Sequence, residues 1–144
     1  MRSFTYHAHV NRTPAALFAF MTDFSRAPTW RSLVGRIEVV GGGALGPGGQ
    51  IVTTMEVMGK VRQATSDVWS YDPPRRIGFR NTASNVTGVF EYVLEPSDGG
   101  TDITFTCDIL PHGFMWLLLP LLVRQNRARY ADQLGRLKRA AEKV

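Results

Sequence analysis

Two consecutive segments of alternating polarity, joined by a tight-turn sequence, constrain the fold of this chain more than any other feature. Their apolar side chains recur at every second position: Phe90, Tyr92 and Leu94 in the first segment, and Ile103, Phe105, Cys107 and Ile109 in the second. Successive side chains of a β-strand point to opposite faces, and Asp98 and Gly99 between the segments favour a hairpin turn. The sequence therefore predicts an antiparallel pair whose apolar face needs a cover.

The carboxyl-terminal segment begins with residues that could form part of that cover. Phe114 to Val123 are mostly apolar, but as a helix they would span only ~15 Å, about half of the ~30 Å hydrocarbon core of a bilayer. Pro120 also interrupts them. We therefore predict that this segment does not span a membrane.

Further along the same segment, apolar side chains recur at helical spacing and fall on one stripe. The stripe comprises Val123, Tyr130, Leu134, Leu137 and Ala141. Extended toward the amino terminus it includes Trp116 and Leu119, so we expect one long helix that starts near Phe114 and lies over the sheet. Asn126 and Arg127 interrupt the edges of the stripe. Either the helix leaves the sheet at these residues, or the space beneath them is not dry.

Three leucines of this segment, Leu118, Leu121 and Leu122, lie off the stripe. A helix that is apolar on every side is normally covered on every side. We therefore expect these leucines to form a gate over a binding site or a homodimer contact. Docking on a lipid surface is the third alternative.

The rest of the chain adds strands and two short helices. Residues 3–10 alternate in polarity, as a strand with one exposed face does. Thr13 followed by Pro14 is a favourable start for a helix, and a β-like pattern resumes from Val34. We predict one α+β domain over residues 1–144. Because the amino terminus has no apolar core like that of a secretory signal, we expect a cytoplasmic location.

The charges and metal-binding side chains exclude several functions. The net charge is +5, and the residues beyond Phe114, seven basic and two acidic, carry the whole excess. These cations surround the helix, so we predict no specific nucleic-acid binding. His7 and His9 share a strand face without a nearby carboxylate or cysteine to complete a metal site. Cys107 is the only cysteine, so we expect neither a disulfide nor a cysteine-based metal centre, and no cofactor.

Several local motifs resemble a known family over essentially the whole chain. They are "LFAFMTDFSRAPTW", the glycine-rich loop before "GGQIVTTMEV", "SYDPPRRIGFR", "GGTDITFT" and the final "QLGRLKRAAE". Together they resemble the SRPBCC superfamily, which is START-like and plant-allergen-like, and in particular its bacterial polyketide cyclase/dehydrase-like branch. The resemblance implies a helix-grip fold, in which a curved antiparallel sheet wraps around a long carboxyl-terminal helix. It also implies two short helices after the first strand.

The resemblance further implies a cavity between the sheet and the helix for a small hydrophobic ligand, lipid-like or polyketide-like. The aromatic inward faces agree, because such pockets are apolar with a few polar groups. The residues expected to line it are Tyr6, Trp30, Met55, Trp69, Phe79, Asn81, Phe90, Tyr92, Phe105, Trp116, Leu119, Val123, Asn126 and Tyr130.

Ligand binding without catalysis is the first functional prediction, and a cyclase or dehydratase is the second. Catalysis would need a proton donor or acceptor inside the cavity. The candidates are Asp67, which shares a strand face with Trp69, the phenols Tyr92 and Tyr130, and His112 near the mouth. The two predictions differ in whether a carboxylate or histidine faces the cavity near those phenols.

Overall fold

A computed structural model describes residues 4–31, 34–43, 45–57, 59–82 and 86–143, without the side chains of Val34, Val57, Met115 and Leu122. Seven strands form one antiparallel sheet in the order β1-β7-β6-β5-β4-β3-β2. The strands are β1 (Phe4–Val10), β2 (Val34–Val39), β3 (Gln50–Val57), β4 (Lys60–Asp72), β5 (Arg76–Thr82), β6 (Val86–Ser97) and β7 (Gly100–Pro111).

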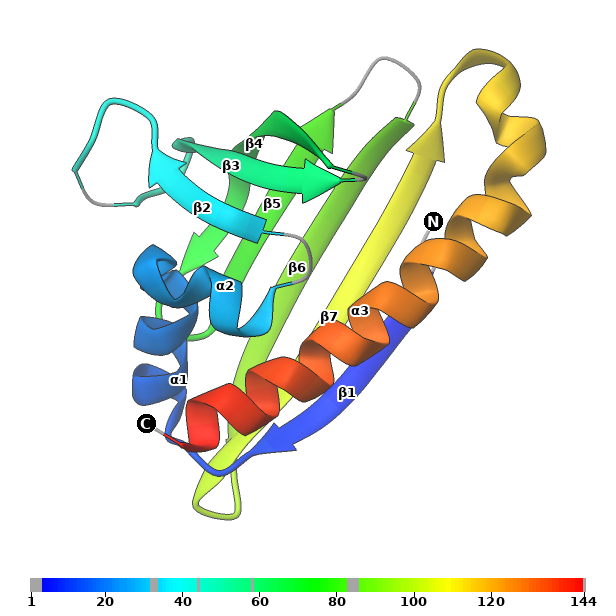
Figure 1. Ribbon diagram of the computed structural model, residues 1–144. Coiled ribbons are helices and arrows are strands. Elements are labelled where there is room, and N and C mark those ends of the chain that lie inside the picture. The colour runs from blue at the N-terminus through cyan, green and yellow to red at the C-terminus, as the bar shows by residue number, and fades with distance from the viewer. Residues whose placement is uncertain (1–3, 32–33, 44, 58, 83–85, 144) are drawn as a thin grey trace.

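The sheet curves around the longest helix, α3 (Leu119–Glu142), which crosses its concave side (Figure 1). Two short helices, α1 (Pro14–Thr22) and α2 (Ala27–Trp30), follow β1, with the 3₁₀ turn η1 (Phe24–Arg26) between them. A second 3₁₀ segment, η2 (Gly113–Leu118), leads into α3. The predicted helix-grip arrangement is confirmed. Within the described residues, no helix combines the length and the apolarity needed to cross a bilayer.

The hairpin of β6 and β7 has the predicted turn and register. Asp98 and Gly99 both have positive φ, 47° and 76°, as both central residues of a type I′ turn require. Tyr92 consequently lies opposite Phe105, and Phe90 lies opposite Cys107. The apolar side chains of both strands therefore share the face that α3 covers.

Helix α1 begins where the sequence predicts. The Thr13 side chain accepts a hydrogen bond from the Ala16 backbone N–H at 3.2 Å, and Pro14 occupies the first turn, where a missing N–H costs nothing. Leu17, Phe18, Phe20 and Met21 are buried. The helix thus closes one end of the core.

Helix α3 starts later than expected, at Leu119 instead of near Phe114. Pro120 is the reason, because proline fits the first turn of an α-helix but removes a hydrogen bond and clashes further inside. The preceding residues form the tighter η2 instead. The 24 residues of α3 correspond to a length of about 36 Å.

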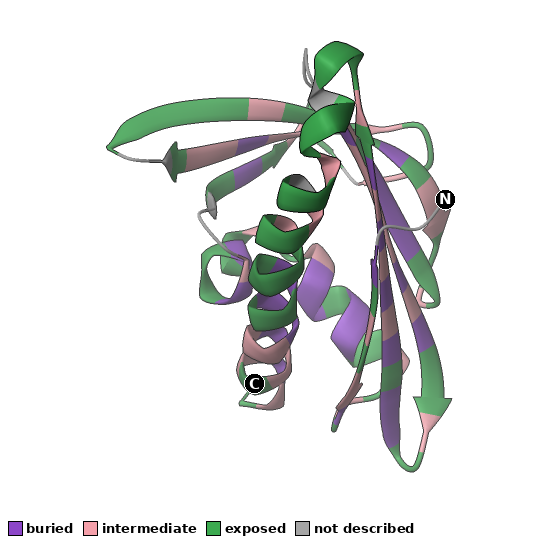
Figure 2. Ribbon diagram, turned by 90° about the vertical axis from the view of Figure 1, so that its right-hand side faces the viewer, coloured by how far each residue is buried: buried purple, intermediate pink, exposed green. Residues whose placement is uncertain are grey.

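Only the carboxyl-terminal half of α3 is firmly seated. Leu134, Leu137 and Ala141 are buried as the stripe predicts, whereas Arg127 is exposed and Asn126 is half-buried. Figure 2 shows the same gradient, with exposed turns at the start of the helix and buried residues toward its end. The polar interruption of the stripe therefore marks the part of the helix that is not packed into a dry core.

We expect Leu137→Ala to lower the free energy of unfolding by about 2–5 kcal/mol, because Leu137 is fully buried and its truncation leaves a cavity. Leu117→Ala is the matched control, since Leu117 is 65% exposed and should change stability by less than about 0.5 kcal/mol. Urea unfolding monitored by circular dichroism measures both. Equal losses would contradict the described seat of α3.

Candidate functional site

A small cavity lies between the inner face of the sheet and the helices α2 and α3. It measures about 60 Å³, room for a few water molecules. The residues that line it are Arg31, Thr53, Met55, Ala64, Ser66, Phe79, Asn81, Phe90, Arg129, Tyr130 and Gln133. Seven of these carry a polar or charged group, so the cavity is polar as well as aromatic.

The floor of the cavity comes from four neighbouring strands. Strand pairing sets Thr53 opposite Ala64, Ser66 opposite Asn81 and Phe79 opposite Phe90. Directly paired residues point their side chains to the same face of the sheet, so all of these side chains lie on one face. The floor therefore changes from hydroxyl and amide groups to aromatic rings from β3 to β6.

The roof comes from the end of α2 and the middle of α3. The Tyr130 ring lies 5.2 Å from that of Phe90 and 5.1 Å from that of Phe105, measured between centroids. One turn further, the buried Gln133 donates a hydrogen bond from Nε2 to the Tyr92 hydroxyl at 3.2 Å. Arg31 and Arg129 complete the roof.

The two tyrosines near the cavity hold their protons firmly. Burial raises the pKa of Tyr92 to about 12, although the positive charge of Arg31 opposes the shift. Burial likewise raises the pKa of Tyr130, against the charge of Arg129. Both phenols are therefore hydrogen-bonding groups at neutral pH and not bases. The described residues that line the cavity include no aspartate, glutamate or histidine.

Sequence reasoning identified part of this lining. Met55, Phe79, Asn81, Phe90 and Tyr130 line the cavity, as expected. Three further residues expected there, Trp30, Tyr92 and Phe105, are buried in the adjoining core. The sequence prediction missed Arg31, Thr53, Ala64, Ser66, Arg129 and Gln133. Thr53 is in phase with Met55, and Gln133 follows Tyr130 by three positions, so both had a periodic signal.

Two residues of β4 that were expected to face the cavity point to the outer face of the sheet instead. Trp69 is 44% exposed on the outer face, where its Nε1 donates to the Phe90 backbone carbonyl at 3.1 Å. Asp67 is exposed and accepts from Gln50 Nε2 at 2.7 Å. The buried residues of this stretch are Ser66 and Val68, so alternation places Asp67 and Trp69 on the outer face. A bulge interrupts the pairing with β5 only between Val68 and Ser70. The expected inward phase of Asp67 and Trp69 is wrong.

The expected residues around η2 also lie outside the cavity. Trp116 is 63% exposed because it precedes the α-helix, so the extension of the stripe to it is wrong. His112 is exposed and forms a 2.7 Å hydrogen bond with the Thr87 hydroxyl. The structure does not bring His112 to the cavity that holds Tyr130.

A separate open groove of about 460 Å³ runs beside the start of α3, and Tyr6 and Val123 line it. The Tyr6 hydroxyl donates to the Arg127 backbone carbonyl at 2.9 Å. Leu119 and Val123 pack partly buried against the core, and Asn126 is half-buried. These four expected ligand contacts therefore surround the first turns of α3 and not the cavity between the sheet and α3.

Among the described residues, no three histidine, cysteine or acidic side chains are close enough together to hold a metal ion. His9 Nδ1 lies 2.8 Å from Asp102 Oδ1, and His7 Nδ1 lies 3.2 Å from the Thr104 hydroxyl. Both histidines thus make pairwise contacts on the outer face.

Comparison with protein families gives a match to the model described as polyketide cyclase / dehydrase and lipid transport, over residues 1–142. The chain belongs to this family. No curated protein matches it significantly in sequence.

Several proteins of known structure share the fold at low sequence identity. Ara h 8.0201 has a TM-score of 0.79 at 20% identity, with 98% of this chain and 97% of the other covered. TTHA0849 from Thermus thermophilus has a TM-score of 0.74 at 17% identity, with 95% and 94% covered. The di-domain ARO/CYC protein BexL has a TM-score of 0.73 at 15% identity, with 96% of this chain and 49% of BexL covered.

Alkaline pH should destabilise the protein partly through Tyr92. Its folded pKa of about 12 exceeds the ordinary value of 10.0, so between these values the unfolded chain loses a proton that the folded chain retains. The free energy of unfolding should therefore fall as pH rises from 10 toward 12, by up to about 1.4 kcal/mol per pH unit for this group. Urea unfolding of the wild type and Tyr92→Phe at several pH values measures this contribution. Identical pH slopes in both proteins would contradict it.

Proposed function

We propose that the protein binds a small hydrophobic or aromatic ligand in the cavity between the sheet and α3. The observation that carries the proposal is the mixed lining, in which the rings of Phe79, Phe90 and Tyr130 adjoin hydroxyl, amide and guanidinium groups. Aromatic walls supply contact area, and a few polar groups fix the orientation of the ligand. The family description, which includes lipid transport, supports the same function.

Ligand entry requires the cavity to widen. Its volume is about 60 Å³. An engineered cavity that admits benzene into a protein core is larger, about 150 Å³. The side chains able to give way are long: Met55, Arg31 and Arg129 all line the cavity, and Met55 is unbranched and adaptable. The described conformation thus corresponds to a closed form of the site.

A polyketide cyclase or dehydratase is the second candidate, because the family description names polyketide cyclase and dehydrase. Such a reaction needs a group that accepts a proton. The residues expected to do so, Asp67 and His112, lie elsewhere, and the tyrosines remain protonated at neutral pH. Binding therefore ranks above catalysis.

We expect Ala64→Leu to weaken binding of the neutral fluorophore N-phenylnaphthylamine at least about tenfold, since the larger side chain fills the cavity that Ala64 lines. Fluorescence titration measures the affinity. Ala128→Leu is the matched control, because Ala128 lines the separate groove beside the start of α3. Loss of binding in Ala128→Leu alone would move the ligand to that groove and overturn the proposed site.

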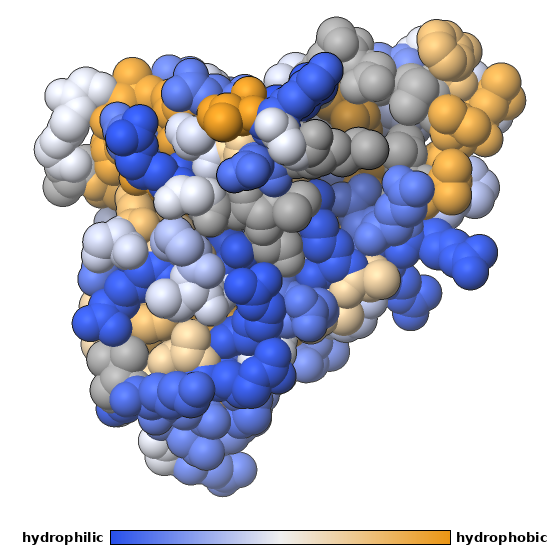
Figure 3. Space-filling model, in the orientation of Figure 1, coloured by the Kyte–Doolittle hydropathy of each residue, from blue (hydrophilic) through white to orange (hydrophobic). Residues whose placement is uncertain are grey.

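The exposed side chains of η2 and early α3 form an apolar cap, defined as Phe114, Trp116, Leu117, Leu118 and Leu121. Figure 3 shows hydrophobic residues gathered at this end of the molecule. Apolar patches of this kind mark interaction surfaces. We propose that a second copy of the chain covers the cap, since a two-fold contact needs no other partner. Leu122, expected in the same contact, has a side chain outside the described part.

Leu118→Asp combined with Leu121→Asp should convert a dimer to a folded monomer, because both exposed leucines lie in the cap and a buried carboxylate opposes association. Light scattering over a range of concentrations measures the mass, and circular dichroism checks the fold. A wild type that stays monomeric would refute the dimer. In that case, binding to anionic vesicles that the double substitution abolishes would assign the cap to a lipid surface.

A further inference from the structure

Two guanidinium groups face the proposed ligand cavity, one from each helix of its roof. Arg31 follows the last residue of α2, and Arg129 lies on α3 next to Tyr130. Neither forms an ion pair with a carboxylate within the described parts of the chain, and the described cavity lining contains no acidic residue. The cavity therefore has an uncompensated positive charge.

The contacts of these arginines leave most of their hydrogen-bond donors unused. The Arg31 guanidinium carbon lies 5.5 Å from the Trp30 ring centroid and 5.7 Å from that of Phe79. Arg129 lies 4.9 Å from the Tyr130 ring centroid and donates one hydrogen bond to the Tyr130 hydroxyl at 3.0 Å. Aromatic contacts hold the guanidinium planes, but each guanidinium has five N–H donors.

Among the described residues, Arg26, Arg36 and Arg76 form ion pairs with carboxylates, whereas most other arginines do not. Arg36 pairs with Glu38 at 2.7 Å and Arg76 with Glu91 at 3.6 Å, although both arginines are more than half exposed. Arg31 is half-buried and Arg129 is exposed, so water solvates part of each guanidinium group when no ligand is bound.

Resting on the proposed ligand-binding function, we propose that the ligand is an amphipathic oxyanion, with a carboxylate, sulfonate or phosphate group facing Arg31 and Arg129. Guanidinium groups bind such oxyanions through paired, charge-assisted hydrogen bonds. The apolar part of the ligand lies against Phe79 and Phe90, on the aromatic side of the floor. Ser66 and Asn81 on the other side supply further donors.

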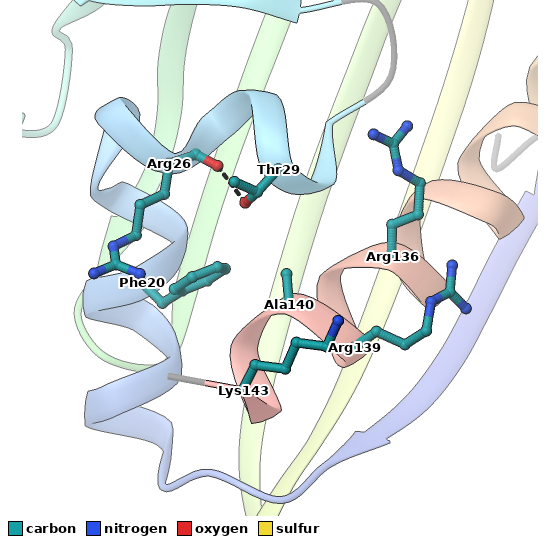
Figure 4. A pocket seen from close by; sticks show the side chains of 7 residues that line it. All are labelled: Phe20, Arg26, Thr29, Arg136, Arg139, Ala140 and Lys143. Carbon is teal, nitrogen blue, oxygen red and sulfur yellow. Dashed lines mark hydrogen bonds between the residues drawn. The ribbon is translucent and has the colours of Figure 1, made fainter.

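A second basic pocket, on the outer surface, provides a control. It measures about 400 Å³ and is lined in part by Arg26, Arg136, Arg139 and Lys143. Figure 4 shows the guanidinium groups of Arg26 and Arg136 directed away from one another, and Arg26 is paired with Asp23 at 3.3 Å. These cations do not converge on one position.

The test compares two probes that share the anilinonaphthalene scaffold and differ by one sulfonate: anilinonaphthalene sulfonate and neutral N-phenylnaphthylamine. Fluorescence titration at fixed ionic strength gives both affinities. We expect the wild type to bind the sulfonate at least about tenfold more tightly, since charge-assisted hydrogen bonds form only to the anion. Arg31→Gln with Arg129→Gln should lower the ratio of the two affinities to about one, because the charge-assisted hydrogen bonds to the sulfonate are lost.

Three controls make the result specific. Arg136→Gln with Arg139→Gln removes the same charge from the outer pocket and should keep the preference. Arg31→Lys with Arg129→Lys keeps the positive charge but removes the planar guanidinium groups, and it should retain part of the preference for the sulfonate probe. Ala64→Leu should weaken the binding of both probes, which would locate them in the cavity. Circular dichroism checks that each variant is folded.

The outcomes separate this inference from the function on which it rests. Equal binding of the two probes, with both lost in Ala64→Leu, would overturn the anionic ligand and leave the ligand cavity standing. A sulfonate preference that survives Arg31→Gln with Arg129→Gln would also overturn it. Binding of neither probe, or binding that ignores Ala64→Leu, would refute the cavity function and the inference together.

Discussion

The packing of the Tyr130 ring on three strands fixes where helix α3 lies. Its centroid is 6.1 Å from that of Phe4 in β1, 5.2 Å from Phe90 in β6 and 5.1 Å from Phe105 in β7. Aromatic pairs at such distances contribute attraction beyond the burial of area. The same contact bounds the cavity, because Tyr130 and Phe90 belong both to this group of packed rings and to the residues that line the cavity.

This boundary divides the interior into two parts with different chemistry. Beyond Tyr130, toward the carboxyl terminus, Leu134 and Leu137 pack in a dry core. Between α2, α3 and strands β3 to β6, the interior instead contains Thr53, Ser66 and other polar groups. Polar groups away from bulk water need hydrogen-bond partners, which is one basis for the proposal that a ligand binds in this part of the interior. The dry core and the polar cavity thus occupy neighbouring regions of one interior.

The candidate site could be predicted where the sequence shows clearly which face of an element is buried, and not where the pattern leaves the buried face open. Phe90 and Tyr130 were correctly predicted to face the interior, because β6 and the later part of α3 keep side-chain periods of two and 3.6 without interruption. The prediction for Asp67 and Trp69 was wrong because the aromatic Trp69 indicated the inner face, whereas Ser66 and Val68 occupy it. Arg31 and Arg129 were missed because arginine is normally exposed, and only spatial proximity reveals that both reach one cavity.

The sequence by itself determined the type of fold, the hairpin at Asp98 and Gly99, and the helix stripe through Leu134 and Leu137. These features depend on neighbours along the chain, through turn geometry and side-chain period. Only the tertiary structure decided the outward position of Trp69 and the place of Arg31 and Arg129 at one cavity. The two arginines are almost a hundred positions apart, and the curvature of the sheet and the angle at which α3 crosses it bring them to the same cavity. The curvature and the crossing angle depend on packing between segments that are distant in the sequence, and no local pattern encodes them.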